Sequence, residues 1–486
     1  RAFFIKISIF EMNEAIRQIQ PVEIWSNFAD INAIPRPSYG EAAIVGAILD
    51  FGKKLGLPTR RDKTGNIVIE KPPQGRGMKS RKTVILQAHV DMVCEPPTHP
   101  HFANGVSMVL ENGWVKAPGS TLGADNGIGV AAAMGLLAST TIPHPPLVGL
   151  FTVTEETGLI GARALDPRIV KKGDILLNLD TEDDEELCIS CAGAIGSIAT
   201  ATYRPELVPD GLSFFKIRVD GLIGGHSGVE IDKHRGNANK LLTRIFYQIF
   251  PKIGLRLASM VNDSARNVIP RNSTAVVGVK TAMVDFFQKE CASLATELRK
   301  EWASTEPNLV FSVEKLDEFP TGLLPAQVQK RLVRALMAAP NGVFRMSPEV
   351  PGLVETSSNL ARVTCHDGQI EVEGLQRSSR ESGKAEVAGA FRAAFESNGF
   401  KVTNRDSYPG WTPNPASPIL QVAKKTFQQV FQKEPSIVNV HAGLECGVIV
   451  EKLARLELDA ISFGPNIRGA HSPGEAVEVA SVERFW

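Results

Sequence analysis

A histidine and an aspartate stand two residues apart at the end of a hydrophobic run, in the segment LQAHVDMV. His89 and Asp91 are expected to point to the same side of this strand, because side chains alternate along a strand. An imidazole in that position can bind a metal ion, and the neighbouring carboxylate can fix which ring nitrogen carries the proton. Taken alone, the pattern also fits a hydrogen-bonded core histidine with a capping aspartate.

A glycine-rich turn, TLGADNGIG, places Asp125 directly before a helical run. Open α/β sheets bind ligands in the crevice at their strand ends, where this turn is expected to lie. The aspartate can be a simple N-cap, and glycines before a helix can hold a phosphate, but the sequence has neither the GxGxxG pattern nor a Walker lysine. A carboxylate that faces the crevice can instead bridge two cations.

More acids and a second histidine follow other predicted strands. Glu155 and Glu156 come directly after LFTVT, Asp180 ends the run ILLNLD, and His471 lies in a Gly/Pro-rich loop near the C-terminus. Two adjacent acids at a strand end point to opposite sides, so one can bind metal while the other acts as a general base. The alternative is a solvated pair in a loop, and the acids after Asp180 are expected to be solvated.

Together these positions supply two histidines, three carboxylates and a spare glutamate. Mixed nitrogen and oxygen ligands without thiolates suit Zn²⁺, with Mn²⁺ or Co²⁺ as alternatives. Five such ligands exceed what one open catalytic zinc requires, and they fit two metals that share a bridging carboxylate. The Cys188-Ile-Ser-Cys191 spacing has no second cysteine pair, which disfavours a zinc or redox role for it.

The elements that must position these residues alternate between strand and helix. Buried-strand runs lie at Lys82–Gln87, Leu147–Thr154 and Asp174–Leu179, and a small apolar helix is predicted at Asp125–Leu137. This alternation predicts an α/β layer around a mostly parallel central sheet.

The pattern changes after about Pro205 and changes back after Lys401. Between them, alternating strands such as Leu212–Val219 and amphipathic helices such as Asp285–Trp302 are typical of an antiparallel sheet with helices on one face. We therefore predict a discontinuous catalytic domain at 12–205 and 401–486, interrupted by an inserted α+β lid domain at 206–400.

Composition limits the classes of function. The length of 486 residues favours two domains, and a net charge of zero gives no basic field for nucleic acid. The longest apolar stretch, Gly127 to Ala138, is too short to span a membrane, and six cysteines in so long a chain favour a reducing cytoplasm. We interpret Arg1 to Phe10 as an extension upstream of Met12 rather than an export signal.

Several longer phrases carry a resemblance to a known family. The chain resembles the zinc metallopeptidase family that includes aminoacylase, carboxypeptidase G and the carnosinases. The matching phrases run nearly from end to end: IPRPS, LQAHVDMV, GWVKAPGSTLGADNGIGVA, TEETG, NLDTE, CAGAIG, GGHSGVEI, NANK, RNVIPR, HAGLECG and GPNIRGAHSPGE.

The resemblance implies a role for each candidate of the catalytic domain. One zinc would be bound by His89 and Asp180 and the other by Glu156 and His471, with Asp125 as the bridge, Glu155 as the general base and Asp91 as the residue that orients His89.

The resemblance also implies roles in and near the inserted domain. His226, in GGHSG, would help to stabilise the oxyanion, and in dimeric relatives this loop reaches the partner subunit's site. Asn267 and Arg377 would hold the terminal carboxylate of the substrate, and His441 and Glu445 would line the substrate pocket or lie just behind it. A tight-turn histidine, a turn asparagine and a surface arginine are the structural alternatives, and Arg380 competes with Arg377 for the carboxylate.

The implied activity is hydrolysis of small dipeptides, Xaa-His dipeptides such as β-Ala-His included, by a cytoplasmic homodimer with two zinc ions per chain. The dimer would form through the lid domain, and neither nucleic acid nor membrane is expected as a partner. The alternatives are an N-acyl amino acid amidohydrolase, another dipeptidase of the family, or a catalytically silent metal-binding homologue. The spare glutamate, Glu155, argues against a silent protein.

Overall fold

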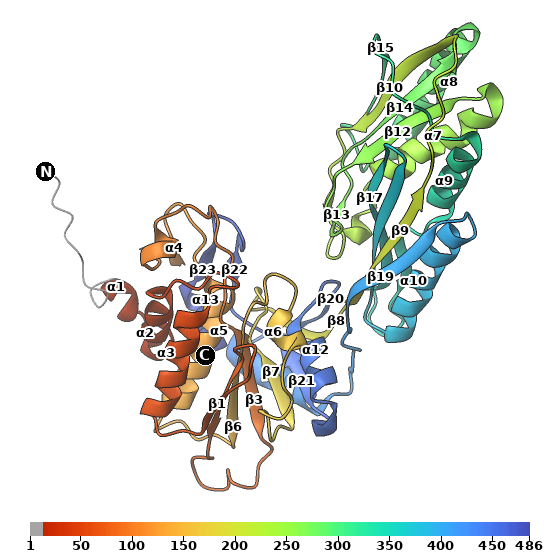
Figure 1. Cartoon of the computed structure of the whole chain (residues 1–486). Helices are drawn as coiled ribbons and strands as arrows, with labels where there is room; N and C mark the ends of the chain where they lie inside the picture. Colours follow the sequence, from red (N-terminus) through yellow and green to blue (C-terminus); the bar gives the residue numbers. More distant parts are fainter. Residues whose placement is uncertain (1–12) are drawn as a thin grey trace, which may run out of the picture. The chain divides into compact units, whose positions relative to one another are not determined.

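The computed structural model describes residues 13–486, so the interpretation of Arg1 to Phe10 lies outside the described residues. The chain forms two compact units (Figure 1). The first unit comprises the described residues up to Cys191, together with Trp411–Asn439 and Gly443–Trp486. The second comprises Ala192–Gly410 and the short segment Val440–Ala442. The predicted discontinuous domain with an inserted domain is thus the arrangement found.

The unit boundaries differ from the predicted ones by one strand at each end. Strands β9 (Gly193–Thr202) and β19 (Lys401–Tyr408) pair with each other within the sheet of the second unit. The sequence of β9, GAIGSIATAT, is built of small residues and does not reveal which sheet it joins. Its place is decided by this long-range pairing.

The first unit is built on an eight-stranded mixed sheet. Its strands, in spatial order, are β1 (Thr59–Arg61), β2 (Ile67–Lys71), β6 (Leu147–Thr152), β3 (Val84–His89), β7 (Ile175–Asn178), β21 (Asp459–Ser462), β8 (Glu186–Cys191) and β20 (Ser436–Val440). The four central strands, β6, β3, β7 and β21, are parallel, whereas β1, β2 and β8 pair antiparallel. The predicted α/β class and parallel centre are found, with antiparallel flanks.

Helices cover both faces of this sheet. On β3, Leu86 and Ala88 belong to the hydrophobic core that also contains Ile128 of α5, whereas Gln87 points the other way and bonds Glu445 of α12. The helices of this unit are α1 (Glu14–Arg17), α2 (Val22–Asn32), α3 (Ala42–Lys54), α4 (His101–Asn104), α5 (Ala124–Ala138), α6 (Ile160–Arg163), α11 (Pro418–Phe431), α12 (Glu445–Lys452) and α13 (Val479–Phe485).

A small four-stranded sheet supports the site loops of this unit. It contains β22 (Ile467–Arg468), β23 (Ala476–Glu478), β5 (Trp114–Lys116) and β4 (Val109–Glu111), in that spatial order. The β22–β23 connection carries His471, and β5 leads into the turn before Asp125. Because β23 pairs with β5, the sheet brings the two candidate ligand loops side by side.

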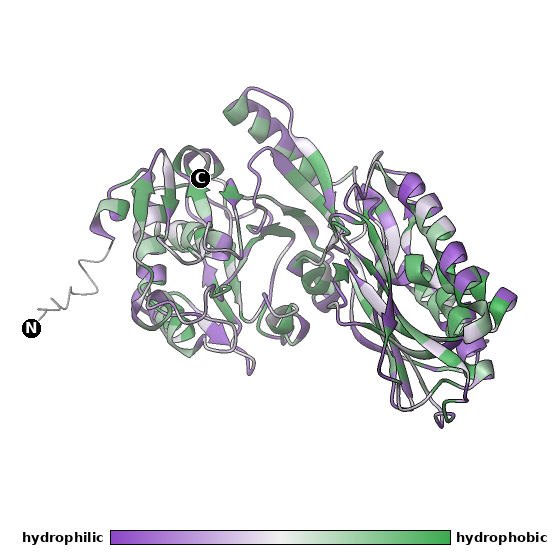
Figure 2. Ribbon diagram, turned by 90° about the horizontal axis from the view of Figure 1, so that it is seen from above, coloured by the Kyte–Doolittle hydropathy of each residue, from purple (hydrophilic) through white to green (hydrophobic). Residues whose placement is uncertain are grey.

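The second unit is a nine-stranded antiparallel sheet. Its main path is β15 (Val310–Leu316), β10 (Leu212–Asp220), β14 (Ser273–Lys280), β12 (Arg256–Asn262), β17 (Val354–His366), β18 (Gln369–Ser378), β9 and β19, and β16 (Gly342–Met346) pairs with β17. The helices are α7 (Ala238–Ile253), α8 (Val284–Trp302), α9 (Ala326–Ala338) and α10 (Glu381–Glu396). They pack on one face around the main hydrophobic core of the unit, with their hydrophilic sides turned away from the sheet (Figure 2).

Among the described residues, no helix is long and apolar enough to cross a membrane.

Candidate metal centre

His89 is the last residue of β3 and is almost completely buried. Its Nδ1 lies 3.2 Å from the Asp91 carbonyl oxygen and 3.5 Å from Asp91 Oδ1. The Asp91 carboxylate also accepts hydrogen bonds from the backbone amides of Glu155 and Glu156, at 2.9 and 3.3 Å, and from the Ser38 hydroxyl at 2.8 Å. Burial opposes this charge, but the hydrogen bonds from His89, the Glu155 amide and Ser38 lower the pKa of Asp91 to about 2. One carboxylate therefore orients the histidine and the Glu155–Glu156 turn.

Asp125 is held from behind by Glu475. The buried Glu475 carboxylate accepts hydrogen bonds from four consecutive backbone amides, those of Leu122, Gly123, Ala124 and Asp125, at distances of 2.7 to 3.2 Å. An Asp125 side chain anchored in this way can present both oxygens to other groups. Its Oδ1 lies 3.0 Å from His89 Nε2, and its Oδ2 lies 3.1 Å from His471 Nε2.

The other four candidate ligands gather around Asp125. Asp180 Oδ1 lies 3.3 Å from His89 Nε2, and Glu156 Oε2 lies 2.9 Å from His471 Nε2. Ligand atoms of His89, Asp125 and Glu156 all lie within 4.8 Å of one another. The parallel register explains the convergence, because β3, β6 and β7 end at the same edge of the sheet.

The carboxylates of this cluster favour a nearby positive charge. Hydrogen bonds to Asp125 and Glu156 raise the pKa of His471 to about 11. Burial opposes a charge on His89, yet Asp180 and the hydrogen-bonded carboxylates hold its pKa well above the ordinary value. Protonated histidines thus balance the carboxylates when no metal is present, and metal binding would release these protons.

Two buried carboxylate oxygens fit the same interpretation. Glu156 Oε1 is buried and accepts no hydrogen bond, and Asp180 Oδ1, also buried, has only the 3.3 Å contact with His89 Nε2. A buried carboxylate oxygen without a partner is costly, and coordination to a cation satisfies it. The donor set of imidazole nitrogens and carboxylate oxygens suits divalent zinc, manganese or cobalt, so these residues fit the metal centre that the sequence predicts.

Glu155 precedes Glu156 in the turn after β6, and the sequence predicts it to be a general base beside this cluster rather than a ligand. Burial raises the pKa of Glu155 well above its ordinary value; His89 opposes the shift, while Asp180, Glu156 and Glu445 reinforce it. A carboxylate with a raised pKa is suited to take up a proton and release it again.

The second unit has its own cluster of polar side chains. β11 (Gly225–His226) pairs with β13 (Val268–Ile269), which places His226 beside Asn267, and the Asn267 carbonyl accepts the Ser227 amide at 2.8 Å. A Cβ at Gly228 would lie 2.2 Å from the His441 carbonyl oxygen, which explains the glycine in GGHSG.

His226 is a neutral hydrogen-bond donor. Burial, and then the nearby Arg377, lower the pKa of His226 to about 4. Its Nδ1 faces the backbone amides of Gly228 and Val229 at 3.2 and 3.3 Å and must act as the acceptor. The proton therefore sits on Nε2, which is free to donate to an oxyanion.

Arg377 lies opposite Ser357 in the β17–β18 ladder, and the Ser357 hydroxyl is 2.7 Å from His441 Nε2. Arg377 is buried, its Nη1 donates to the Tyr408 hydroxyl at 3.1 Å, and its Nε has no partner. No carboxylate in the described chain pairs with Arg377, whereas Arg380 pairs with Glu349 and Glu355. Arg377 is thus the better placed of the two arginines to bind a free carboxylate.

Glu445 is the most deeply buried of the predicted pocket residues. It is fully buried in the first unit, and its Oε2 accepts hydrogen bonds from Gln87 at 2.5 Å and Thr152 at 2.6 Å. Of the two positions predicted for Glu445, lining the substrate pocket or lying just behind it, this burial favours the second. His441, from the same HAGLECG segment, belongs to the second unit.

Sequence reasoning missed three residues that organise the site. Glu475 holds the Asp125 turn, Ser38 bonds Asp91, and the buried Arg36 donates to the carbonyls of Val90 and Asp91 at 3.1 and 3.0 Å. All three lie inside phrases that carried the family resemblance, IPRPS and GPNIRGAHSPGE. The family resemblance of those phrases was the only signal for these residues, and it did not show which groups they bind.

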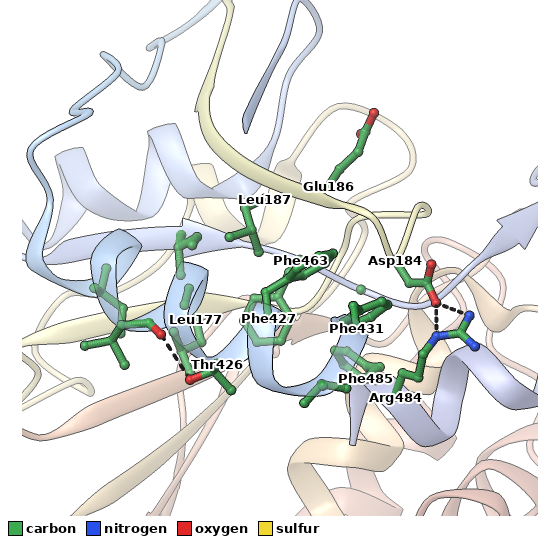
Figure 3. A pocket seen from close by; sticks show the side chains of 16 residues that line it. Leu177, Asp184, Glu186, Leu187, Thr426, Phe427, Phe431, Phe463, Arg484 and Phe485 are labelled. Carbon is green, nitrogen blue, oxygen red and sulfur yellow. Dashed lines mark hydrogen bonds and ion pairs between the residues drawn. The ribbon is translucent and has the colours of Figure 1, made fainter. Parts of the chain in front are cut away.

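A separate apolar pocket of about 240 Å³ lies elsewhere in the first unit (Figure 3). Phe427 and Phe431 of α11, Phe463 and Phe485 line it, and Arg484 paired with Asp184 lies at one end. Because its lining contains none of the metal-ligating cluster, it is distinct from the candidate metal centre.

Comparison with known proteins assigns the family. Residues 85–485 match the model of peptidase family M20/M25/M40, and the chain belongs to this family. The predictions of a peptide-bond-hydrolysing enzyme and of its α/β fold are thereby confirmed.

Two relatives match almost the whole chain. The chain is 39% identical over 474 residues to the cytosol non-specific dipeptidase of Escherichia coli (strain K12), covering 97% of both chains. It is 37% identical to the aminoacylhistidine dipeptidase of Vibrio alginolyticus, whose crystal structure matches with a TM-score of 0.89 over 97% of this chain and 96% of that one. The aminopeptidase PepT of Bacillus cereus, 17% identical with a TM-score of 0.60 over 96% of each chain, shares the fold.

Proposed function

We propose that the chain is a metal-dependent dipeptidase whose substrates include Xaa-His dipeptides such as β-Ala-His. The observation that carries the proposal is the convergence of four candidate ligands around a fifth, Asp125, with Glu155 beside them. The Escherichia coli and Vibrio alginolyticus relatives are both named as dipeptidases, and the second is named for aminoacyl-histidine substrates. Their names support the substrate class.

The proposed cofactor is a pair of Zn²⁺ ions, with Mn²⁺ or Co²⁺ as alternatives. His89 and Asp180 would hold one ion, Glu156 and His471 the other, and Asp125 would bridge them. Bound divalent cations would make a water molecule more acidic and polarise the peptide carbonyl.

The residues of the chain then divide the work of hydrolysis. Asp91 keeps the His89 ring in place from its Nδ1 side. Glu155 accepts a proton from the attacking water and delivers it to the leaving amine. In the second unit, His226 donates from Nε2 to the oxyanion, and Arg377 with Asn267 binds the free C-terminal carboxylate. This last contact restricts substrates to peptides with a free carboxyl end.

The decisive test is a substrate panel with metal analysis on the same sample. Hydrolysis of β-Ala-His, Gly-His and an N-acetylated amino acid is measured, with metal content determined before and after chelation. Cleavage of the histidine dipeptides with about two metals per chain, lost with chelator and restored by Zn²⁺, is the expected result. Cleavage of only the acylated substrate would make the protein an amidohydrolase. Bound metal without hydrolysis would contradict the proposal.

We also propose that two copies associate through the second unit, and that the protein acts in the cytoplasm. The edge strand β15 supports the first point, because it ends the sheet and presents an unshared strand side. The name of the Escherichia coli relative, a cytosol dipeptidase, supports the second. Light scattering on the purified chain tests the dimer, and a monomer at assay concentration would contradict it. Cell fractionation tests the cytoplasmic location.

A further inference from the structure

Four buried polar side chains form a row across the centre of the first unit's sheet. They come from adjacent parallel strands, and none of them is exposed to solvent. We call this set the polar row: Thr152 of β6, Gln87 of β3, Asn178 of β7 and Ser462 of β21. Strands buried on both faces normally carry apolar side chains, so a continuous polar row at this position needs a reason.

The hydrogen bonds of the row all run towards one end. The Ser462 hydroxyl donates to Asn178 Oδ1, and the Asn178 amide donates to Gln87 Oε1 at 2.6 Å. The Gln87 amide donates to Thr152 Oγ1 at 3.1 Å and to Glu445 Oε2 at 2.5 Å, and the Thr152 hydroxyl donates to the same Oε2 at 2.6 Å. Glu445 is the final acceptor, so its carboxylate determines the orientation of both amides.

The polar row lies directly behind the candidate metal ligands. Gln87 precedes His89 by two residues on the same face of β3, and Asn178 precedes Asp180 by two residues at the end of β7. Thr152 is the register partner of His89 in β6, the strand that leads to Glu156. A row that fixes these strand ends also fixes the separation of the ligands that follow them.

Glu445 itself is poorly explained by stability alone. It is fully buried, it has no ion pair in the described part of the chain, and its Oε1 has no hydrogen-bond partner. Replacing such a buried charged group by a well-packed apolar one is often neutral or stabilising. A buried carboxyl group kept at this position is better explained by the neighbouring cation site, where an outer carboxyl group that holds the strand ends adds rigidity.

We propose that Glu445 is a positioning residue of the metal centre, which acts through Gln87 and Thr152 to set the strand ends that carry His89, Asp180 and Glu156. This inference rests on the proposed metal centre. It assigns Glu445 a role in metal affinity and ligand geometry without substrate contact.

The test uses three variants of the full chain. Glu445→Gln removes the charge but keeps the shape and an acceptor oxygen. Thr152→Val removes one donor to Glu445 with little change in volume. Asp62→Asn is the matched control, because Asp62 is a buried carboxylate of the same unit that bonds the backbone amides of Thr64, Gly65 and Asn66.

The readouts are Zn²⁺ affinity and stoichiometry by competition with a chromophoric chelator, and the visible spectrum of the Co²⁺-loaded protein. Glu445→Gln should bind at least one metal about 10-fold or more weakly, with an altered Co²⁺ spectrum, as for other outer partners of metal ligands. Thr152→Val should show a smaller loss of affinity, and Asp62→Asn should match the wild type in both readouts even if it unfolds at lower temperature.

Three results would overturn the inference. If Glu445→Gln has the metal affinity and Co²⁺ spectrum of the wild type, the inference about Glu445 is contradicted, while the proposed metal centre is not. If Glu445→Gln does not fold, unchanged affinity and spectrum in Thr152→Val would have the same meaning. Failure of the wild-type chain to bind metal would remove the proposed centre and this inference with it.

Discussion

The Glu475 carboxylate accepts the backbone amide of Asp125 at 3.2 Å, although the two residues are 350 positions apart in the chain. Glu475 follows His471 by four residues in the β22–β23 connection. The loop that carries one candidate ligand therefore holds the turn that carries the bridging candidate. Three neighbouring amides share the same carboxylate, so the turn before α5 is fixed by a single charged acceptor.

Replacing Glu475 by glutamine should therefore damage both stability and metal binding. The amide group of glutamine would turn its own N–H donors towards two of the four backbone amides, leaving buried donors unsatisfied. We expect a loss of about 3 kcal/mol in the free energy of unfolding of the metal-free protein. Urea titration and Zn²⁺ stoichiometry measure the two effects. The exposed Glu483→Gln is the control, and equal behaviour of the two variants would contradict the role of Glu475.

Glu155→Gln should separate chemistry from metal binding. Glu155 is predicted to act as a general base rather than as a metal ligand, so the variant should keep the metal content of the wild type. Turnover should fall by roughly 10²- to 10⁴-fold, the usual contribution of a general base. Glu156→Gln is the informative partner variant, because it should lose metal. Substantial activity in Glu155→Gln with full metal content would assign the proton transfer to another group.

Arg377→Lys should weaken substrate binding without affecting the metal. The guanidinium forms a planar fork that matches a carboxylate, and lysine cannot reproduce this geometry. We expect KM for Gly-His to rise by about 10-fold or more, since a bidentate pair contributes at least 1.4 kcal/mol in such a site. Arg380→Lys should have a much smaller effect, because Arg380 is already paired with Glu349 and Glu355. A larger effect at Arg380 than at Arg377 would reverse the assignment.

Much of the candidate site could be predicted because its residues follow strands with a clear local signal. The runs ending at His89, Glu155 and Asp180 are apolar over several residues, and the observed strands β3, β6 and β7 lie within two residues of the predicted bounds. Parallel strands that end at one edge necessarily bring such residues together. The same reasoning predicted the antiparallel second unit, whose strands alternate in the sequence.

The rest depends on contacts that local patterns do not contain. Glu475 looks like an ordinary loop acid until the β23–β5 pairing brings its loop against the turn before Asp125. Glu445 lies in the phrase HAGLECG, which resembles a family segment beside the substrate pocket. In the structure it is the first residue of α12, and its side chain is completely buried. The observed unit boundaries differ from the predicted ones for the same reason. The pairing of β9 with β19 places both strands in the second unit, and their composition does not reveal this.

His441 should make the second unit sensitive to mild acid. Burial, and then the nearby Arg377, lower the pKa of His441 from 6.5 to about 3, so the folded protein resists its protonation. The unfolded chain takes up this proton below about pH 6.5. Stability from this residue is therefore complete above pH 6.5 and declines as the pH falls towards 3, by about 2 kcal/mol at pH 5. Calorimetric unfolding at pH 7.5 and pH 5 should show a smaller decline in His441→Gln than in the wild type. His234→Gln, at an exposed position, should keep the wild-type decline. An equal decline in all three proteins would show that folding does not lower the pKa of His441.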